Sequence, residues 1–417
     1  MIYPMHEKPH PAVPSGNLTV IKWLTFLMFM MFAMTTDSVG VIIPEIIREF
    51  KLSLTAAGAF HYATMAAIAL AGIFLGFLAD RLGRKRTIVL GLVLFALNSF
   101  LFAIGHSFAF FLALLVVSGA AIGIFKTGAL ALIGDISTST TEHTTTMNTV
   151  EGFFGVGAII GPALVTWLLG AGVAWKWLYV IAGGLCVVLI ITAALVRYPT
   201  TMKPAAESVG LARTAAMMKN PFALGFSLGA FLYVATECAI YVWMPTLFKD
   251  YAGSATLMAA YALPIFFGLR AGGRFLGAWV LARWDWAAVV TLFSLAILAC
   301  FAGSVLGGIG AAVWLLPLSG LFMSVIYPTL NSKGISCFPK AQHGAVAGVI
   351  LFFSCAAAAL GPLAMGAVSD AFGGARAGFV LATGFAALLF AGLLLNLIFQ
   401  PARARLCALD ASEYAAP

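Results

Sequence analysis

Five ionisable residues lie deep within long apolar stretches of this sequence: Asp37, Lys126, Glu151, Glu237 and Arg270. An ionised side chain at the centre of a membrane-spanning helix costs about 2.5–3.5 kcal/mol on insertion scales, so such residues are usually paired or face water, and usually serve a function. A carboxylate among them can exchange a proton, because burial raises its pKa while a nearby cation lowers it. The five residues therefore predict a site that handles protons or ions inside a membrane.

The composition supports a membrane protein. Of the 417 residues, 62% are hydrophobic and 9% are charged, whereas about 25% of the residues in a soluble domain are charged. A spanning helix needs about 20 apolar residues and satisfies its own backbone hydrogen bonds in lipid. We expect an all-α membrane protein with twelve transmembrane helices, at 19–47, 55–79, 87–105, 108–134, 147–170, 176–197, 221–248, 255–281, 287–304, 310–333, 343–369 and 377–399. The Ser- and Thr-rich segment 136–147 is expected to be a loop.

The cationic residues predict the topology. With both termini inside, the cytoplasmic loops carry most of the loop Lys and Arg, as the positive-inside rule requires. We assign the net charge of +8 to topology and to contact with the lipid bilayer, and expect no nucleic acid partner. The expected protein is a multi-pass protein of a bacterial inner membrane with both termini cytoplasmic. Its parts are a tail at 1–18, a six-helix bundle at 19–197, a linker at 198–220, a second six-helix bundle at 221–399 and a tail at 400–417.

The two bundles repeat each other at an offset of about 200 residues. Thr36–Asp37 in the first span matches Thr236–Glu237 in the seventh, and Gly161–Pro162 in the fifth matches Gly361–Pro362 in the eleventh. Repeated halves are typical of alternating-access transporters, whose site lies between the halves near the midplane. The glycine–proline pairs, together with Gly157, are expected to allow close helix packing and to mark bends.

A short charged turn, Gly-Phe-Leu-Ala-Asp-Arg-Leu-Gly-Arg-Lys-Arg at 76–86, separates the second and third apolar stretches. Its residues Gly76, Asp80, Gly83 and Arg84 resemble the loop between spans two and three of the major facilitator superfamily of transporters. Asp135 matches the acidic residue that pairs with this loop in that family. The resemblance extends over the whole chain, and it implies two pseudo-symmetric six-helix bundles. It also implies a latch, formed by these five residues, that holds the inner end closed in the outward-facing state.

Other segments resemble particular branches of that superfamily. Tyr233–Trp243, Gly273–Gly277 and Gly320–Thr329 are similar to segments of the fucose, glucose and galactose proton symporters. Lys126 is a departure, because those sugar symporters are expected to carry a carboxylate there. The stretch Gly157–Pro162 resembles the span-five signature of the superfamily's antiporters.

The resemblance implies that spans one, four, seven and ten line a central cavity, which puts Asp37, Lys126 and Glu237 on cavity helices. Asp37 is the first candidate for proton coupling, Glu237 the second and Glu151 the third. Asp37 could instead form a fixed ion pair with Lys126, and Glu151 could lie at a helix N-terminus, where the dipole favours a carboxylate. Lys126 could bind an anionic group of the substrate or serve as counter-ion to Asp37 or Glu151.

Arg270 and Arg274 lie one turn apart on the eighth span and share a face. Arg270 suits the recognition of a carboxylate or phosphate, or it could bind Glu237 or backbone carbonyls. Arg274, nearer the inner end, is assigned to gating. His61 is expected to be an interfacial residue in preference to a proton relay. Further substrate contacts are expected from Tyr233, Tyr241, Trp243 and Tyr327.

Other classes of site find no support in the sequence. The six cysteines form no C-x-x-C pair, so neither a metal site nor a disulfide framework is indicated. No Walker loop and no nucleophile–base set is present. Amide side chains are scarce in the spans, which argues against a close copy of a sugar symporter, because buried hydroxyls without partners are costly.

These observations predict a proton-coupled secondary active transporter, not an enzyme, that moves a small organic solute by alternating access. The solute would be an organic anion or a sugar-like molecule. We expect no cofactor, a proton gradient or else a sodium gradient as the energy source, and a monomer. The first alternative is a proton-driven antiporter that exports amphipathic compounds or drugs. A more distant alternative is a non-transporting membrane sensor on the same fold.

Overall fold

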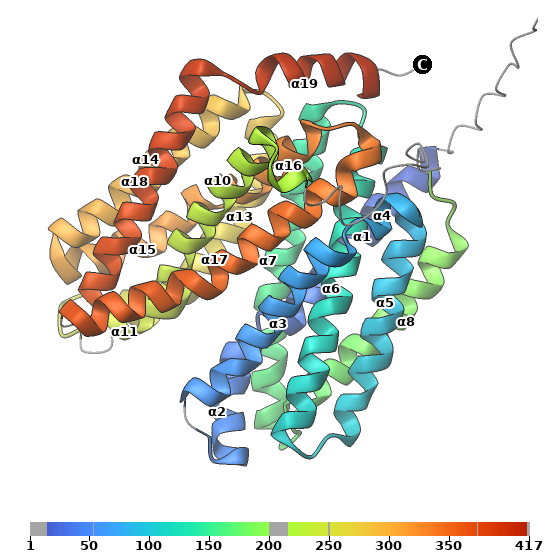
Figure 1. Ribbon diagram of the computed structural model, residues 1–417. Helices are drawn as coiled ribbons and strands as arrows, with labels where there is room; N and C mark the ends of the chain where they lie inside the picture. The colour runs from blue at the N-terminus through green and yellow to red at the C-terminus, as the bar shows by residue number, and fades with distance from the viewer. Residues whose placement is uncertain (1–14, 53, 200–215, 249–250, 373, 415–417) are drawn as a thin grey trace, which may run out of the picture.

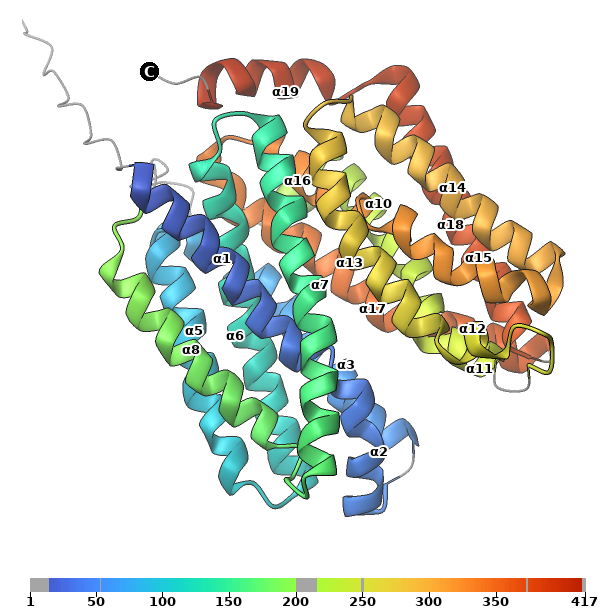
Figure 2. The same ribbon diagram turned by 180° about the vertical axis from the view of Figure 1, so that it is seen from behind.

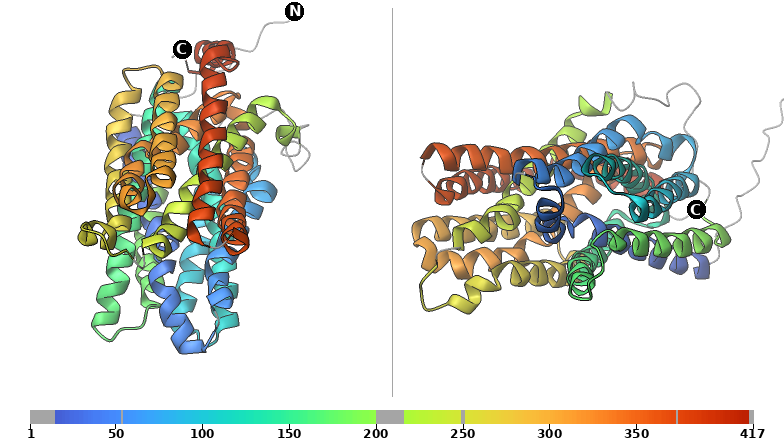
Figure 3. Two further views of the ribbon diagram at one scale, coloured as in Figure 1. Left: turned by 90° about the vertical axis from the view of Figure 1, so that its left-hand side faces the viewer. Right: turned by 90° about the horizontal axis from the view of Figure 1, so that it is seen from below.

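The computed structural model describes residues 15–52, 54–199, 216–248, 251–372 and 374–414, which form helices joined by short turns (Figure 1). Two bundles, one from each half of the chain, lie side by side (Figure 3). We call the end that carries the Gly76–Arg86 turn the inner end, and the opposite end the outer end. The predicted tail at 1–18 and linker at 198–220 fall largely outside the described residues, and the other domain boundaries stay predictions.

The amino-terminal half contains α1 (Ser15–Thr36), α2 (Val39–Phe50), α3 (Leu54–Leu75), α4 (Leu78–Arg81), α5 (Arg84–Leu101), α6 (Phe108–Ile136), α7 (Thr140–Gly170) and α8 (Trp177–Leu195). The carboxy-terminal half contains α10 (Pro221–Cys238), α11 (Met244–Phe248), α12 (Thr256–Ala260), α13 (Ala262–Leu281), α14 (Trp286–Leu306), α15 (Gly308–Met323), α16 (Ile326–Ser336), α17 (His343–Phe372) and α18 (Ala375–Phe399). A last helix, α19 (Arg403–Leu409), lies across the inner end (Figure 2).

Ten helical stretches among the described residues are long and apolar enough to cross a membrane. Two further helices complete the set. The apolar part of α3, Ala59–Leu75, is shorter, and the 20-residue α13 carries Arg270 and Arg274, which lower its hydropathy. Twenty helical residues extend about 30 Å, the thickness of the hydrocarbon core. The expected all-α membrane fold of twelve spanning helices is confirmed.

The first and seventh spans are interrupted beside their carboxylates, which the sequence did not predict. The first span is divided between α1 and α2, with Asp37 and Ser38 at the break. The seventh changes from α10 to a π-helical turn at Ala239–Trp243, directly after Glu237 and Cys238. Irregular helix of this kind often marks a functional site. The offset of 200 residues therefore relates two breaks as well as two acidic residues.

The segment 136–147 is not a loop, and that expectation is wrong. Helix α7 begins at Thr140, because Ser139 accepts a hydrogen bond from the backbone N–H of Glu142 at 3.0 Å. Ser139 and Glu142 have the spacing of a capping box, which satisfies free N–H groups at a helix start. Helix α7 thus extends beyond the apolar span and carries Thr140–Met147 to the inner end.

Glycines let the two halves touch backbone to backbone near the inner end. The contacting residues are Gly72 of α3, Gly76 directly after it, and Gly344 and Gly348 of α17, so that each pair is spaced four apart. A Cβ atom at Gly348 would lie 2.1 Å from the carbonyl oxygen of Gly72, so no side chain fits there. Small residues at this spacing allow close helix crossings in membranes. This crossing positions the turn at 76–86 against the start of α17.

Arg84 is the centre of a buried charge cluster at the inner end. Its Nη1 lies 2.6 Å from Asp80 Oδ1, and its Nε lies 2.8 Å from Asp135 Oδ2. Its Nη2 donates to the backbone oxygen of Lys340, in the other half, at 2.5 Å. The side chain of Arg84 is 1% exposed, so these partners replace its water. Gly83, directly before α5, has φ of 88°, a backbone conformation that favours glycine.

Asp80 joins the same cluster to α17. Its two carboxylate oxygens accept hydrogen bonds from the backbone N–H groups of Gly344 and Ala345, each at 3.1 Å. These groups belong to the first turn of α17, where free N–H groups and the helix dipole favour an anion. Asp80 therefore acts as an N-terminal cap supplied by the opposite half. The latch residues Asp80, Arg84 and Asp135 meet in this structure, and their role in gating stays a prediction.

A second layer of contacts joins α7 to α16. The pairs are His143 with Ser336 at 2.6 Å, Thr144 with Ser332 at 3.0 Å, Asn148 with Thr329 at 3.4 Å, and Lys333 Nζ with the Thr140 carbonyl at 3.0 Å. Nearly all of these side chains are less than 4% exposed. The hydrogen bonds between the halves, among the described residues, cluster at the inner end. In Figure 1, α2 and α11 lie at the lower ends of the two bundles, away from the inner end.

The carboxy-terminal segment bridges both halves across the inner end. Arg405 Nε donates a hydrogen bond to the carbonyl of Cys337 at the end of α16. Asp410 accepts hydrogen bonds from the backbone N–H of Thr140 at 2.8 Å and from its hydroxyl at 3.0 Å. The side chain of Leu406 is buried beneath α19. The segment predicted as a tail at 400–417 is thus docked on the two halves as far as residue 414.

Asp80→Asn is expected to open the inner end. The amide cannot neutralise Arg84 and cannot accept all three hydrogen bonds, and a loss of about 2 kcal/mol would shift the ratio of closed to open molecules about thirtyfold. The measurement, in a background whose six native cysteines are replaced by alanine, is the rate at which a Ser332→Cys reporter, buried between α7 and α16, reacts with an impermeant thiol reagent from the inner side. Arg81→Gln removes an exposed charge from the same turn and serves as control. An unchanged rate in Asp80→Asn would contradict the latch.

Asp410→Ala is expected to loosen the docked carboxy-terminal segment. Loss of a helix cap costs about 0.5–2 kcal/mol, so the melting temperature should fall by a few degrees and labelling of the Ser332→Cys reporter should rise. The exposed Ser412→Ala variant should change neither quantity. If both variants melt and label like the parent protein, the contact between Asp410 and Thr140 contributes nothing to closure.

Candidate functional site

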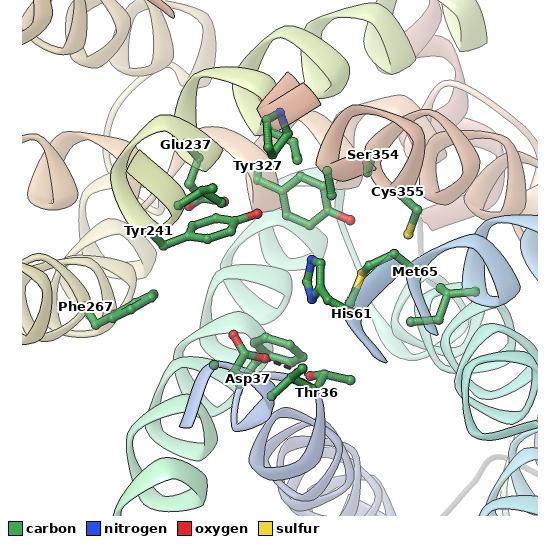
Figure 4. Close-up of a pocket in the computed structure, with 18 of the residues that line it drawn as sticks. Thr36, Asp37, His61, Met65, Glu237, Tyr241, Phe267, Tyr327, Ser354 and Cys355 are labelled. Carbon is green, nitrogen blue, oxygen red and sulfur yellow. Dashed lines mark hydrogen bonds between the residues drawn. The ribbon is translucent and has the colours of Figure 1, made fainter. Parts of the chain in front are cut away.

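A cavity of about 460 Å³ lies between the two halves (Figure 4). Residues of α1, α2, α3, α6 and α7 line it on one side, and residues of α10, α13, α16 and α17 line it on the other. Its size lies in the range of small-molecule sites, about 300–1,000 Å³. The glycine crossing and the latch lie between this cavity and the inner end.

The cavity contains as many acidic as basic residues. Its lining includes Asp37, Glu151 and Glu237 on the acidic side, and Lys126, Arg270 and Arg274 on the basic side. All five deep ionisable residues expected from the sequence are therefore brought together, along with Arg274. Their partners decide which of them are available to a substrate or a proton.

Glu237 and Arg270 form an ion pair within the carboxy-terminal half. Arg270 Nε lies 2.9 Å from Glu237 Oε1, and the hydroxyl of Tyr233 donates a hydrogen bond to the same oxygen at 2.6 Å. The side chain of Glu237 is 7% exposed and that of Arg270 is 14% exposed. A hydroxyl donor and the charge of the guanidinium together compensate the burial of this carboxylate. Of the alternatives for Arg270, the structure shows the contact with Glu237.

Glu151 and Arg274 connect the two halves at the inner end of the cavity. Arg274 Nη1 donates a hydrogen bond to the backbone oxygen of Glu151 at 2.6 Å, and its Nη2 lies 3.4 Å from the carboxylate. Helices α7 and α13 run side by side here (Figure 2). Glu151 lies well inside α7, because that helix begins at Thr140. The helix N-terminus proposed for Glu151 is therefore wrong.

Asp37 is differently placed. It lies at the break between α1 and α2, and its carboxylate accepts a hydrogen bond from the hydroxyl of Thr36 at 2.7 Å (Figure 4). It forms no ion pair with any residue that the structure describes. The fixed ion pair with Lys126 is therefore absent from this structure. Asp37 is a cavity carboxylate with a hydroxyl donor, and no cation among the described residues lies within ion-pair distance of it.

Lys126 also lacks an ionic partner among the described residues. Its ammonium lies 4.7 Å from the centre of the Phe154 ring and 5.9 Å from that of Phe29. A cation over an aromatic face gains about 0.5–2 kcal/mol, less than a full counter-ion supplies. Neither Asp37 nor Glu151 is the counter-ion of Lys126 here, which corrects both alternatives.

The four predicted aromatic contacts divide into two groups. Tyr241 and Tyr327 line the cavity (Figure 4). Tyr233 lies outside the lining and stacks on Tyr327, with ring centres 6.2 Å apart. Trp243 also lies outside the lining, and its ring faces Gly366 of α17. Direct contact of Tyr233 or Trp243 with a substrate therefore has no support in this conformation.

Several cavity residues were missed by the sequence analysis. His61 of α3 projects into the cavity (Figure 4), although it was expected at the membrane interface. Phe154, Phe267 and Ser354 also line it. Nothing in the sequence distinguishes Phe154 and Phe267 from the other phenylalanines, of which the chain has 34 in all. A histidine within an apolar span, in contrast, is unusual enough to have indicated a cavity residue.

The glycine–proline pairs lie inside unbroken helices. Helix α7 continues through Pro162, and α17 continues through Pro362. Gly157 and Gly161 face the backbone of α1, where a Cβ atom would lie 2.1–2.2 Å from carbonyl oxygens. Gly361 similarly approaches Ala235 of α10. The structure shows the packing role, and bending at these sites stays a prediction.

The Glu237–Arg270 pair can be tested with a double-mutant cycle. Glu237→Gln or Arg270→Gln alone leaves one buried charge uncompensated, and each should destabilise the protein by about 3–5 kcal/mol. The double variant removes both charges and should recover much of that loss. The measurement is thermal unfolding in detergent. Strictly additive losses would show that the two charges are not coupled.

Comparisons with known proteins agree with this geometry. The "Glucose/galactose transporter" of Brucella abortus is 26% identical over 367 residues, covering 83% of this chain and 87% of that protein. The Staphylococcus aureus "Quinolone resistance protein NorA" is 31% identical over 145 residues, covering 34% and 36%. The solved structure of FucP in the outward conformation has 20% identity and a TM-score of 0.76, covering 91% of this chain and 99% of that one, so the fold is shared.

A family model provides the decisive match. It is the model of the Major Facilitator Superfamily, and it aligns with residues 25–362. This match covers most of the chain, including the turn at 76–86, both helix breaks and all six charged residues of the cavity. The chain therefore belongs to the Major Facilitator Superfamily.

Proposed function

We propose that this transporter couples the movement of protons to that of a small organic solute, an organic anion or a sugar-like molecule, by alternating access. The observation that carries the proposal is Asp37, a cavity carboxylate at a helix break with one hydroxyl donor and no ion pair to any described residue. Broken helices near the midplane form the sites of many secondary transporters. A carboxylate without a fixed counter-ion can gain a proton without breaking a salt bridge.

The closed inner end supports alternating access. Latch, glycine crossing and α7–α16 contacts all lie on one side of the cavity. In this proposal the structure is the outward-facing state, the inner end is cytoplasmic, and both termini lie in the cytoplasm of a bacterium. Opening inward would break the bonds that Asp80 makes to α17 and the pair of Arg274 with Glu151. Proton and solute would bind before that opening, and the protein would act as a monomer.

Glu237 is a weaker candidate for the proton site than Asp37. Its carboxylate is already held by Arg270 and Tyr233, so its protonation would leave a buried guanidinium uncompensated. Glu151 is similarly held by Arg274. We therefore assign these two residues to the framework of the cavity, and Asp37 to coupling.

The relatives narrow the choice between import and export. The glucose/galactose transporter aligns over most of both chains, which favours a small sugar-like solute and hence the first candidate. The second candidate, a proton-driven exporter, is favoured by the partial match to NorA, which includes quinolone resistance in its name. The direction of coupling separates them: protons and solute move together in symport and in opposite directions in antiport.

Asp37→Asn is expected to uncouple transport. In proteoliposomes loaded with a pH dye, addition of galactose, galacturonate or mandelate to the parent protein should carry protons inward with a transported solute. Asp37→Asn cannot exchange a proton, so this flux should fall at least tenfold, while binding measured by thermal shift should persist. The surface variant Glu45→Gln is the matched control, because Glu45 pairs with Arg48 outside the cavity.

Three outcomes of this experiment would count against the proposal. Unchanged proton flux in Asp37→Asn would exclude Asp37 as the coupling residue. A sodium gradient that drives uptake where a proton gradient does not would replace the coupling ion. Proton entry that drives solute out of preloaded vesicles would establish the exporter.

A further inference from the structure

The acidic and basic residues that line the cavity balance each other in number. Its lining has three acidic and three basic residues, and four of the six form two internal pairs, Glu237–Arg270 and Glu151–Arg274. The remaining two, Asp37 and Lys126, form no ion pair with described residues. With all six ionised, the empty cavity has no net charge. Among the described lining residues, one carboxylate and one ammonium are left free to respond to ligands.

The surroundings of Lys126 suit the binding of an anionic ligand. Its ammonium faces the cavity from α6 and rests on the Phe154 ring at 4.7 Å. An ammonium inside a membrane protein is stabilised by a counter-ion or by water. Of the described cavity carboxylates, Glu237 and Glu151 pair with arginines, and Asp37 forms no ion pair with Lys126. A ligand carboxylate is the group that would complete this site.

We propose that the solute of this cavity is a small organic monoanion whose carboxylate binds Lys126, and that it binds together with one proton on Asp37. This inference rests on the proposed function and names its substrate class. The empty cavity and the cavity that holds both ligands are then both neutral. A cavity that holds only the proton carries one positive charge, and a cavity that holds only the anion carries one negative charge.

This charge balance supplies the coupling. Closing the outer end removes the cavity from water, and an uncompensated charge there costs several kcal/mol. The two neutral states can close and reopen on the other side, whereas the two singly loaded states resist closure. A neutral solute would leave the protonated cavity with an uncompensated positive charge at the moment of closure. A dianion would leave a negative one.

The other titratable groups of the cavity do not alter the count. His61 of α3, Tyr241 after α10, Tyr327 of α16 and Cys355 of α17 face the same space. Unperturbed imidazole, phenol and thiol groups are mainly neutral at pH 7. Arg270 and Arg274 of α13 and Lys126 of α6 are the cations that act on Asp37. Protonation of Asp37 therefore makes the cavity more positive and favours an anion.

The walls of the cavity suit an apolar or weakly polar body on this anion. Phe154 of α7 and Phe267 of α13 line the cavity from opposite halves, and Tyr241 adds an amphipathic ring. No Asn or Gln is among the described lining residues, so a polyol finds few amide partners. A volume of about 460 Å³ accommodates a monocyclic carboxylate.

Binding can be measured with two matched pairs of probes on the purified protein. Mandelate and galacturonate are monoanions, and mandelamide and galactose are their neutral counterparts. We expect at least one anion to bind at least tenfold tighter than its neutral counterpart, and Lys126→Gln to abolish that preference. Lys126→Arg should retain it, and the surface variant Arg48→Gln should not affect it. Retained binding of the neutral probe shows that Lys126→Gln is folded.

The pH dependence gives a second readout. Anion binding to the parent protein should tighten as the pH falls, because protonation of Asp37 adds a positive charge to the cavity. Asp37→Asn mimics the protonated state, so in a His61→Gln background, which removes the imidazole that can titrate in the same range, it should bind the anion tightly at every pH between 5.5 and 7.5. Binding that weakens on acidification, or an Asp37→Asn variant with unaltered pH dependence, would overturn the inference.

Electrical measurements decide between the inference and the broader proposal. Symport of one proton with one monoanion moves no net charge, so uptake should not respond to a membrane potential set with potassium and valinomycin. Uptake of galactose with a proton that accelerates at negative interior potential would overturn the inference and leave proton symport standing. Equal binding of anion and neutral probe by the parent protein would overturn it as well. The proposed function itself depends on the separate test of Asp37.

Discussion

The structure depends on one constraint: a charge taken out of water inside a membrane protein must find a compensating partner. Arg84 meets it with two carboxylates and a backbone carbonyl from the opposite half. Asp80 meets it with Arg84 and with two N–H groups at the start of α17. Because part of each set comes from the other half of the chain, the halves cannot separate at the inner end without exposing or stranding these charges. Closure of the inner end is thus a consequence of charge compensation, supported by the backbone contacts that Gly72 and Gly348 permit.

The same constraint explains why the cavity pairs are divided as they are. Glu237 and Arg270 belong to one half, so their pair can survive a rocking motion. Glu151 and Arg274 belong to different halves, so their contact must change when the halves move. A pair within one half maintains the shape of the site, whereas a pair between halves contributes to one conformation only. Asp37 belongs to neither pair, and under the proposed function it is the carboxylate that responds to protons.

Much of this architecture could be predicted from local sequence. The apolar stretches and the repeat at 200 residues are properties of the sequence itself, and they indicated the helix count and the two bundles. The members of the latch were indicated by the resemblance of the turn at 76–86 and of Asp135 to the major facilitator superfamily. Glu237 was one of the alternatives for Arg270, whereas the partner of Arg274 could not be predicted, because it depends on helix rotation and on a contact with Glu151, 123 positions away. The cap that Asp80 provides for α17 spans 264 positions. His61 was misplaced because its position near a predicted helix end suggested the interface, and only the packing of α3 against the cavity shows otherwise.

The repeat also shows that two equivalent positions can have different partners. Asp37 and Glu237 occupy equivalent positions beside helix breaks, yet only Glu237 has an arginine one ion-pair distance away. The position in α6 that could have supplied Asp37 with a cation holds Lys126, but its ammonium rests on aromatic rings instead. Glu237 therefore has an ionic partner in this structure, whereas Asp37 has none among the described residues. A coupled transporter needs such an asymmetry. A carboxylate that already has an ionic partner gains little interaction free energy when a proton or a ligand binds, so its binding cannot shift the equilibrium between conformations.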